Sequence, residues 1–386
     1  MKRVPPADPK GPGARLAFFA ICAVWLASMA GHYAVMGARV RGDGGRYLSA
    51  AASLLAGREL SAKQLLFLPY ELFLAGLHWL GGGPVSAVAA NCLFTLGAAL
   101  LLWWMLKRGG EPLAGLVGAL ALLVTVEIQR WNFYVLVEPF ATNLLLAVIC
   151  LAIIARKSGG WVAYLLPFLC FVLSAARPDT NFFLLPLALY LIFFSGPKGR
   201  AAGGLVLAIF LAMLAFSLEG ASAFQVKAYW LKGSYIWGRK GIPVPQDADQ
   251  TMGLIQFALD NFWWSLKLVG YRLYYQLSNI RPYYSLTHNL SNLLLSLAAY
   301  GLAIYGSLRK PSWWKESALI WLVFLIQTGM AAVSWADWDG RWLDRVLPPL
   351  YILAGIGVVA LLGDWRGRRA RGADQGSLGA STFTQP

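Results

Sequence analysis

The stretch Leu16–Gly57, LAFFAICAVWLASMAGHYAVMGARVRGDGGRYLSAAASLLAG, joins a long apolar segment to a charged loop and a helix rich in small residues. Residues 16–36 are apolar over the length needed to cross a bilayer, about 20 residues. The segment is too long for the apolar core of a cleavable signal peptide, so we expect an uncleaved signal-anchor helix. The loop after it holds one carboxylate, Asp43, among three arginines. This acid, just outside a membrane helix, is the first candidate for chemistry.

The overall composition is that of a membrane protein. Hydrophobic residues make up 58% of the 386 residues and charged residues 13%, with a mean hydropathy of +0.57. A soluble domain carries roughly 25% charged residues. Apolar runs of membrane-spanning length recur along the chain, which predicts an all-α, polytopic membrane protein. The net charge of +15 lies largely in loops, where it fits orientation in the membrane and contact with anionic lipids, and not nucleic acid.

We expect about ten membrane-spanning helices, with both termini in the cytoplasm. Short loops that carry lysine and arginine alternate with loops that carry acids, and the positive-inside rule assigns the basic loops to the cytoplasm. The external loops 37–83 and 219–288 are each expected to contain juxtamembrane helices at the membrane interface. Residues 1–15 and 364–386 are expected to be disordered tails around a single transmembrane domain, 16–363. The predicted spans cover about 16–36, 84–106, 112–128, 134–155, 161–176, 179–195, 201–218, 289–308, 317–334 and 346–363.

Asp43 and its neighbours form a first group of candidate site residues. An aspartate ahead of a helix is a preferred N-cap, and it is equally suited to act as a general base for a sugar acceptor hydroxyl. Arg46 follows three residues later, so it can neutralise Asp43 or hold a donor phosphate. Tyr47 lies beside them, and Glu71, in a short apolar piece at 65–80, is a second acid in the same loop.

A second group lies at helix ends predicted on the same external side. Glu138 precedes a proline and opens a helix, where an acid can complement the helix dipole or bind sugar hydroxyls. Arg177 and Asp179 flank a proline in a tight hairpin between two spans. An arginine there runs against the positive-inside trend, which suggests an anionic ligand.

Arginines before the last predicted span form a third group. Arg341 and Arg345 lie among acids and tryptophans in the segment 335–349. They could form local ion pairs in an aromatic belt, or they could clamp a phosphate, since arginine binds phosphate through two parallel hydrogen bonds. Arg281, followed by a proline and two tyrosines, is a weaker candidate of the same kind.

The sequence does not indicate a metal or disulfide site. The cysteines lie inside apolar runs without a CxxC pair, and the histidines are scattered. The sequence also lacks a P-loop, a GxSxG elbow and an HExxH helix, which disfavours the ATPase, hydrolase and protease classes that carry them. The residues concerned are Cys22, Cys92, Cys150 and Cys170, and His32, His78 and His288.

Taken in order, these positions resemble the GT-C superfamily of polyprenyl-phosphate-sugar-dependent glycosyltransferases. Within it, the chain is similar to the protein O-mannosyltransferase and aminoarabinose-transferase branch of bacterial inner membranes. Asp43, with Tyr47 and the run 50–57, looks like the family's acid ahead of a Y-x-x-x-A-x-x-L-L-x-G helix in the first external loop. The resemblance covers roughly residues 16–360 and is best from 40 to 195. Its other elements are Leu68-Pro69-Tyr70, Glu138-Pro139, Arg177-Pro178, and Gly340-Arg341-Trp342-Leu343 with Pro348.

The resemblance implies a GT-C fold and sugar transfer with inversion at the periplasmic face. A polyprenyl-phosphate sugar would be the donor, and a glycan, lipid or protein the acceptor. Asp43 would take the proton of the acceptor hydroxyl, and arginines would stabilise the departing lipid phosphate. No cofactor is required, although some GT-C members use a divalent cation. Many relatives have two adjacent acids where this chain has Asp43 and Gly44, so Glu71 is a candidate for the second carboxylate.

Two other functions stay open. A transporter or flippase for a lipid-linked anion would use the same arginines without needing Asp43 as a base. Transport sites usually lie near the membrane midplane, whereas the charges here gather at one surface. A non-catalytic subunit of a polysaccharide-assembly complex would keep the fold around a degenerate site.

Overall fold

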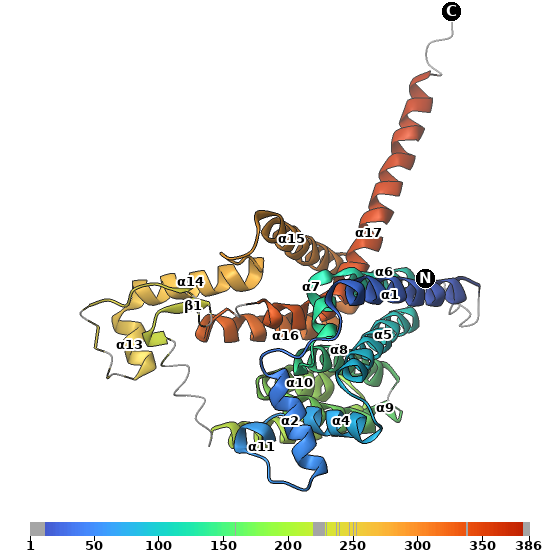
Figure 1. Ribbon diagram of the computed structural model, residues 1–386. Coiled ribbons are helices and arrows are strands. Elements are labelled where there is room, and N and C mark those ends of the chain that lie inside the picture. Colours follow the sequence, from blue (N-terminus) through green and yellow to red (C-terminus); the bar gives the residue numbers. More distant parts are fainter. Residues whose placement is uncertain are drawn as a thin grey trace, which may run out of the picture.

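The computed structural model describes residues 12–380 apart from 159, 219–227, 229, 237, 239, 247, 250, 252, 337 and 338. The described chain is almost entirely helical, with one two-stranded sheet (Figure 1). The helices are α1 (Pro12–Met36), α2 (Gly44–Leu55), α3 (Ala62–Leu65), α4 (Leu68–Trp79), α5 (Pro84–Arg108), α6 (Pro112–Val124), α7 (Val126–Gln129), η1 (Arg130–Phe133), α8 (Val137–Ser158), α9 (Val162–Ala176), η2 (Pro178–Phe183), α10 (Leu184–Phe194), α11 (Pro197–Leu218), α13 (Leu254–Asp260), α14 (Phe262–Ser278), α15 (Leu286–Arg309), η3 (Pro311–Trp313), α16 (Trp314–Val333) and α17 (Arg341–Ala380). The strands are β1 (Ser234–Ile236) and β2 (Lys240–Gly241), which pair antiparallel.

The expected class, an all-α polytopic membrane protein, is confirmed. Among the described residues, 7 helices are long and apolar enough to cross a membrane, and 8 if a bent pair counts as one span. That pair is α6 with the segment Val126–Phe133, and the two parts meet at an angle of 60°. The expected number of about ten also counted the two shorter apolar helices, Val162–Ala176 and Pro178–Phe194.

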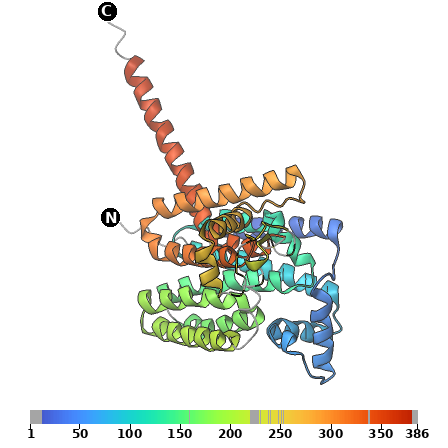
Figure 2. The same ribbon diagram turned by 90° about the vertical axis from the view of Figure 1, so that its left-hand side faces the viewer.

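The basic turns gather at one end of the bundle. Lys310, after α15, forms an ion pair with Glu111, before α6. Arg156 and Lys157, at the end of α8, both pair with the buried Glu316 of α16. In Figures 1 and 2 the start of α1 and the end of α17 lie toward the same side, while in Figure 2 the blue helices that include α2 and α4 lie on the opposite side. The segregation of basic turns expected from the sequence is therefore present in the fold.

The loop 37–83, which the sequence predicts to be external, contains helices as expected. The apolar piece predicted at 65–80 forms α4, which has 12 residues and is not among the candidate spans. A helix of this length covers only about 18 Å, less than the hydrocarbon core of about 30 Å. α4 packs against α2, and its short length fits the expected position outside the spans.

The second loop predicted to be external, 219–288, also contains helices, in the part that the structure describes. The apolar stretch expected at 253–277 forms α13 and α14. Trp230, Phe257 and Leu268 build a small hydrophobic cluster separate from the main core. Figure 1 shows α13, β1 and α14 together at the left, beside the bundle.

The tails differ from the expectation. A disordered tail was predicted from residue 364, but α17 continues to Ala380 and extends out of the bundle (Figure 1). No proline interrupts the sequence between Pro349 and Pro386, and arginine and alanine both favour helix, so nothing stops the last span at the membrane surface. At the other end α1 begins at Pro12, inside the tail predicted at 1–15, and residues 1–11 lie outside the described residues.

Glycines allow α15 and α17 to pack closely. A Cβ added to Gly306 of α15 would lie 2.2 Å from the Leu353 carbonyl oxygen of α17, and one added to Gly357 of α17 would lie 2.0 Å from the Leu302 carbonyl oxygen. These separations are below any van der Waals contact, so the two backbones must move apart if either glycine gains a side chain. Small residues at helix contacts are the usual route to such packing in membranes.

Replacing Gly306 with alanine is therefore expected to destabilise the protein by about 1–3 kcal/mol, the usual cost of overpacking. Gly301→Ala, five residues earlier on the same helix, is the matched control, because a Cβ at Gly301 meets nothing within 4 Å. Both substitutions raise helix propensity equally. Thermal unfolding of the purified protein in detergent should give a lower Tm for Gly306→Ala only, and equal Tm values for the two variants would contradict the packing.

Candidate functional site

Five residues singled out from the sequence meet in one group at the end of the bundle opposite the basic turns. We call Glu138, Arg177, Asp179, Arg341 and Arg345 the arginine–carboxylate cluster. Glu138 Oε1 accepts hydrogen bonds from Arg177 Nη1 at 2.6 Å and from Arg341 Nη1 at 2.7 Å. Asp179 accepts from Arg177 Nε at 2.9 Å and from Arg345 Nη1 at 2.7 Å. The cluster joins α8, the hairpin between α9 and α10, and α17.

Each member lies at a helix end, which explains why these residues meet. Glu138 is in the first turn of α8, and Asp179 is in the first turn of η2. Arg177 terminates α9 in an extended conformation before a proline. Arg341 and Arg345 belong to the start of α17. Acids complement helix N-termini, and the up-and-down course of the chain brings these ends to the same level.

The arginines of the cluster are engaged by carboxylates and are not open to solvent. The side chain of Arg345 is 0% exposed and that of Arg341 is 16% exposed. Arg341 and Arg345, the candidates for a phosphate clamp, are therefore largely buried and paired with carboxylates in this structure. Arg345 Nε and Nη2 and Glu138 Oε2 are buried without a hydrogen-bond partner among the described residues. Such atoms mark places where water or a ligand group would complete the network.

Asp43 is at the N-cap position of α2, but its side chain makes no capping hydrogen bond. Capping of α2 by the Asp43 side chain, one of the two roles expected from the sequence, is therefore not observed. Its side chain is 51% exposed and lies 3.4 Å from Arg46 Nη2. The Arg46 guanidinium also lies over the rings of Tyr47 and Phe67, at 4.8 and 4.9 Å from their centroids. Among the candidate carboxylates Asp43, Glu71, Glu138 and Asp179, Asp43 has the most exposed side chain.

Two buried tyrosines connect α2 and α4 to the cluster. Tyr47 and Tyr70 pack edge to face, with ring centroids 5.2 Å apart. Burial raises the pKa of both phenols, and the negative charge of Glu138 acts on both in the same direction. Tyr47 and Tyr70 also belong to one hydrophobic cluster with Val137 and Ala176, the chain neighbours of Glu138 and Arg177. α2 and α4 therefore pack beside the arginine–carboxylate cluster.

The loop before α2 is fixed by backbone pairing. Arg39 forms a parallel bridge with Tyr134, through hydrogen bonds from its own N to Phe133 O and from Val135 N to its own O. A Cβ on Gly44 would lie 2.7 Å from the Val135 carbonyl oxygen, so only glycine fits there. The Asp43-Gly44 pair, which departs from the two adjacent acids of many GT-C relatives, thus has a packing reason.

Arg281 is not part of the cluster. It is fully buried and donates from Nη1 to the carbonyl oxygens of Tyr275 and Ile280, at 2.6 and 2.7 Å. Its backbone N also donates to Asn289 Oδ1 at 2.8 Å. These bonds hold the chain reversal between α14 and α15, so the structure gives Arg281 a packing role.

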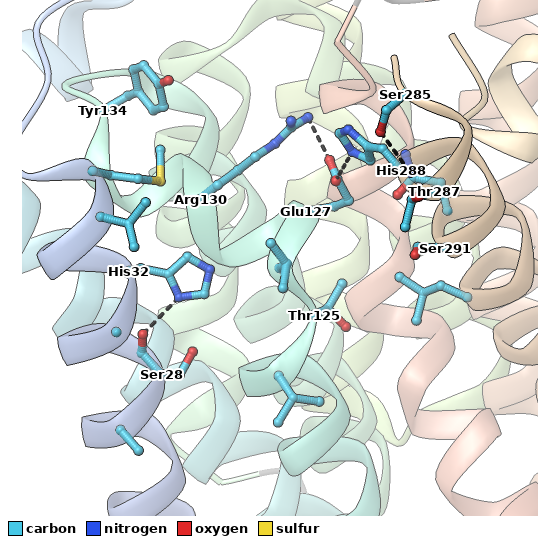
Figure 3. Close-up of a pocket in the computed structure, with 18 residues that line it drawn as sticks. Ser28, His32, Thr125, Glu127, Arg130, Tyr134, Ser285, Thr287, His288 and Ser291 are labelled. Carbon is cyan, nitrogen blue, oxygen red and sulfur yellow. Dashed lines mark hydrogen bonds and ion pairs between the residues drawn. The ribbon is translucent and has the colours of Figure 1, made fainter.

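A large cavity among the described residues was not predicted from the sequence. It is a groove of about 1110 Å³ between the outer end of α1 and the start of α15, with the break between α6 and α7 along its floor (Figure 3). We call it the α1–α15 groove. Thr125 at the break is extended, and its hydroxyl donates to the Ala121 carbonyl oxygen at 2.7 Å. The chain turns there by 60°, and Val126 and Glu127 of α7 line the groove.

A histidine–carboxylate–arginine group lies at the polar part of this groove. His288 Nε2 is 2.5 Å from Glu127 Oε1, and Arg130 Nη2 is 2.7 Å from Glu127 Oε2 (Figure 3). The His288 ring stacks on Tyr284 with centroids 4.1 Å apart. No local sequence pattern indicates this group, because Glu127 and His288 are separated by 161 residues.

The groove and the cluster are connected through Trp131. Its ring lies between two guanidinium groups, those of Arg130 at 4.7 Å and Arg341 at 5.6 Å. Arg130 Nη2 also donates to the Asp339 carbonyl oxygen at 2.6 Å, and Arg341 Nε donates to the Asp339 carboxylate at 2.8 Å. A continuous set of polar contacts therefore runs from the hairpin of α9 and α10 to the groove.

Within the part of the chain that the structure describes, no group of three or more histidine, cysteine, aspartate or glutamate side chains could hold a metal ion. No protein-family model matches the chain, and a search of curated proteins finds no match.

Glu71 is the member of the predicted site whose protonation should change the protein's stability. It is buried in α4, and neither carboxylate oxygen has a hydrogen-bond partner among the described residues. Burial raises the pKa of Glu71 from 4.5 to about 7, against a smaller opposing effect of Arg46. Between these pH values the unfolded chain releases the proton while the folded protein keeps it. The free energy of unfolding should therefore fall as pH rises from about 4.5 to about 7, and then stay level.

Glu71→Gln removes this titration. The Tm advantage of the variant over wild type should be smallest near pH 4.5 and should grow until about pH 7. Thermal unfolding in detergent at several pH values measures the difference. An offset between the two proteins that does not change with pH would contradict the buried, protonated state of Glu71.

Proposed function

We propose that this protein is a membrane glycosyltransferase that moves a sugar from a polyprenyl-phosphate donor to an acceptor hydroxyl, with inversion. The observation that carries the proposal is the position of Asp43. It is a half-exposed carboxylate with no capping bond, on a helix that packs through Tyr47 against the arginine–carboxylate cluster. Three residues that carry the resemblance to GT-C, Glu138, Arg177 and Arg341, meet in that cluster, together with the candidates Asp179 and Arg345.

Asp43 fits the role of general base. A sugar hydroxyl has a high pKa, and a carboxylate within hydrogen-bond reach can take its proton as the hydroxyl attacks the anomeric carbon. The bond from that carbon to the phosphate oxygen breaks, and the phosphate leaves with the lipid. Arg46, whose guanidinium lies 3.4 Å from the Asp43 carboxylate, would stabilise the charge that develops on the leaving phosphate.

The buried cluster would act as a rigid support. Glu138, Arg177 and Asp179 are held by hydrogen bonds on several sides, so they can fix the position of α2 and α4 during the reaction. A site supported by packed side chains keeps reacting groups within the narrow geometry that transfer requires. Under this proposal the donor phosphate contacts Arg46, which is 3.4 Å from its carboxylate, and the cluster arginines, held by carboxylates at 2.6–2.9 Å, position it only indirectly.

The proposal includes an orientation. The end of the bundle with the basic turns would face the cytoplasm, together with both termini, and Asp43 would face the periplasm across a bacterial inner membrane. The GT-C fold itself is part of the proposal, and it is supported by the juxtamembrane helices of the first external loop.

A transporter or flippase of a lipid-linked anion is the second candidate. The α1–α15 groove favours it, because a groove between two spans is a route by which a lipid could pass. The distribution of charge favours the transferase, since Asp43 and the cluster lie at one end of the bundle.

Asp43→Asn is expected to lower sugar transfer by about 10²–10⁴-fold, the usual contribution of a general base. The assay follows label from a polyprenyl-phosphate sugar pool into lipid, glycan and protein fractions of membranes at matched expression. Glu59→Gln is the control, since Glu59 is an exposed acid in the same external loop.

Full transfer by Asp43→Asn would remove Asp43 from the mechanism and direct attention to Glu71 or Glu138. Absence of transfer by wild type with every donor would contradict the glycosyltransferase proposal and favour a transporter or a non-catalytic subunit.

A further inference from the structure

The α1–α15 groove has the depth of one membrane leaflet. Its lining on α1 runs from Ala27 to Met36, and its lining on α15 runs from Thr287 to Leu295. Nine residues of helix cover about 14 Å, close to half of the hydrocarbon thickness of about 30 Å. α1 packs on α5 and α6, and α15 packs on α17 and α14, so the groove separates the two helices (Figure 3).

The groove is amphipathic. Its apolar lining includes Ala27, Val35, Val124 and Leu295, which are suited to a hydrocarbon chain. At about 1110 Å³ it exceeds the usual 300–1,000 Å³ of a pocket for a small ligand. A single lipid drawn from one leaflet fits both the depth and the chemistry of these walls.

The polar part of the groove carries balanced charge. Arg130 is neutralised by Glu127 at 2.7 Å, and Glu127 also binds His288. Because a carboxylate only accepts hydrogen bonds, His288 Nε2 donates to Glu127. Arg130 and Glu127 are the arginine and the carboxylate among the lining residues, and their charges cancel, so the lining offers a phosphate no unpaired arginine or lysine.

Uncharged hydrogen-bonding groups surround this pair. Thr287 and Ser291 are exposed hydroxyls on α15, and His32 projects from α1 on the other side (Figure 3). His32 Nδ1 lies 2.8 Å from the Ser28 carbonyl oxygen, which fixes the ring and turns Nε2 away from that contact. Such groups donate to and accept from hydroxyls, and the Tyr134 ring at the upper end adds an aromatic face.

We propose that the α1–α15 groove binds a lipid with an uncharged, hydroxylated head group, and that this lipid is the sugar acceptor. Its hydroxyls would contact His288, His32 and the hydroxyls of α15, and its chain would lie along the apolar lining. The acceptor role rests on the proposed glycosyltransferase function, whereas the binding does not. The groove ends at Met36 and Tyr134, and Arg39 joins both of them to the loop that carries Asp43, because its Nε donates to the Met36 carbonyl oxygen and its Nη1 to the Tyr134 hydroxyl. A head group at that end would lie beside the catalytic loop.

Photo-cross-linking of the full chain in nanodiscs tests the binding. Two diazirine-bearing probes with the same chains are compared, a monoglucosyl diacylglycerol and the anionic phosphatidylglycerol, and labelled peptides are mapped by mass spectrometry. The neutral probe should label 27–36 and 285–295 about tenfold more strongly than the anionic probe, a preference of about 1.4 kcal/mol.

Gly31→Leu should reduce this labelling about tenfold, since Gly31 lines the groove and its Cβ would point into open space. Gly301→Leu is the matched control, because Gly301 lies on α15, is exposed, and also has nothing within 4 Å of an added Cβ. His288→Leu should reduce labelling by the neutral probe more than labelling by the anionic probe. Equal Tm values for the variants and wild type establish that each is folded.

Equal labelling by both probes, or full labelling of Gly31→Leu, would overturn the proposal. Asp43→Asn should keep wild-type labelling, because binding does not require the base. If wild type is labelled in the groove but transfers no sugar to the glucolipid, the groove binds the lipid and the lipid is not the acceptor. Transfer to a glucolipid that never labels the groove would overturn the site and leave the transferase.

Discussion

The carboxylate of Glu138 is buried at the start of α8, and an isolated charge there would be very costly. Arg177 and Arg341 donate to it at 2.6 and 2.7 Å, from helices far apart in the sequence. In a medium of low dielectric constant such pairs persist only when each charge has its partner, and removal of one partner typically costs about 3–5 kcal/mol. The ends of α8, α9 and α17 are therefore held at one level, and the outer end of the protein is built around this requirement.

The same contacts position the two features that carry the functional proposals. Tyr47 and Tyr70 seat α2 and α4 against Glu138, which fixes the loop with Asp43. On the other side, the Trp131 ring contacts both Arg130, which lines the α1–α15 groove, and Arg341 of the cluster, so the two features meet at this ring. A catalytic loop and a lipid groove attached to one rigid network would keep a fixed distance during a reaction. This arrangement suits transfer between two lipid-anchored molecules.

The hydropathy of the sequence predicted the membrane class and most helix positions, because apolar length alone decides which segments can cross a bilayer. Helix-end signals pointed to Glu138, Arg177, Asp179, Arg341 and Arg345, and the structure brings them together. Their pairing could not be predicted, since which carboxylate an arginine meets depends on the order of helices in space. For the same reason the Glu127–His288 pair was missed, and Arg281 gave no local sign that backbone carbonyls would satisfy it. The continuation of α17 beyond residue 364 could not be predicted from hydropathy, because hydropathy shows where an apolar segment ends and not where a helix ends.

A double-mutant cycle between Glu138 and Arg341 tests the central claim most directly, because these residues are 203 positions apart and meet only in this fold. The free energy of unfolding in detergent is measured for wild type, Glu138→Gln, Arg341→Gln and the double variant. A cycle of Glu138→Gln with Arg309→Gln, at the opposite end of the bundle, is the control. The account predicts a coupling of about 0.5–3 kcal/mol for the first cycle and additivity for the control. Additive effects of Glu138→Gln and Arg341→Gln, within about 0.5 kcal/mol, would contradict it.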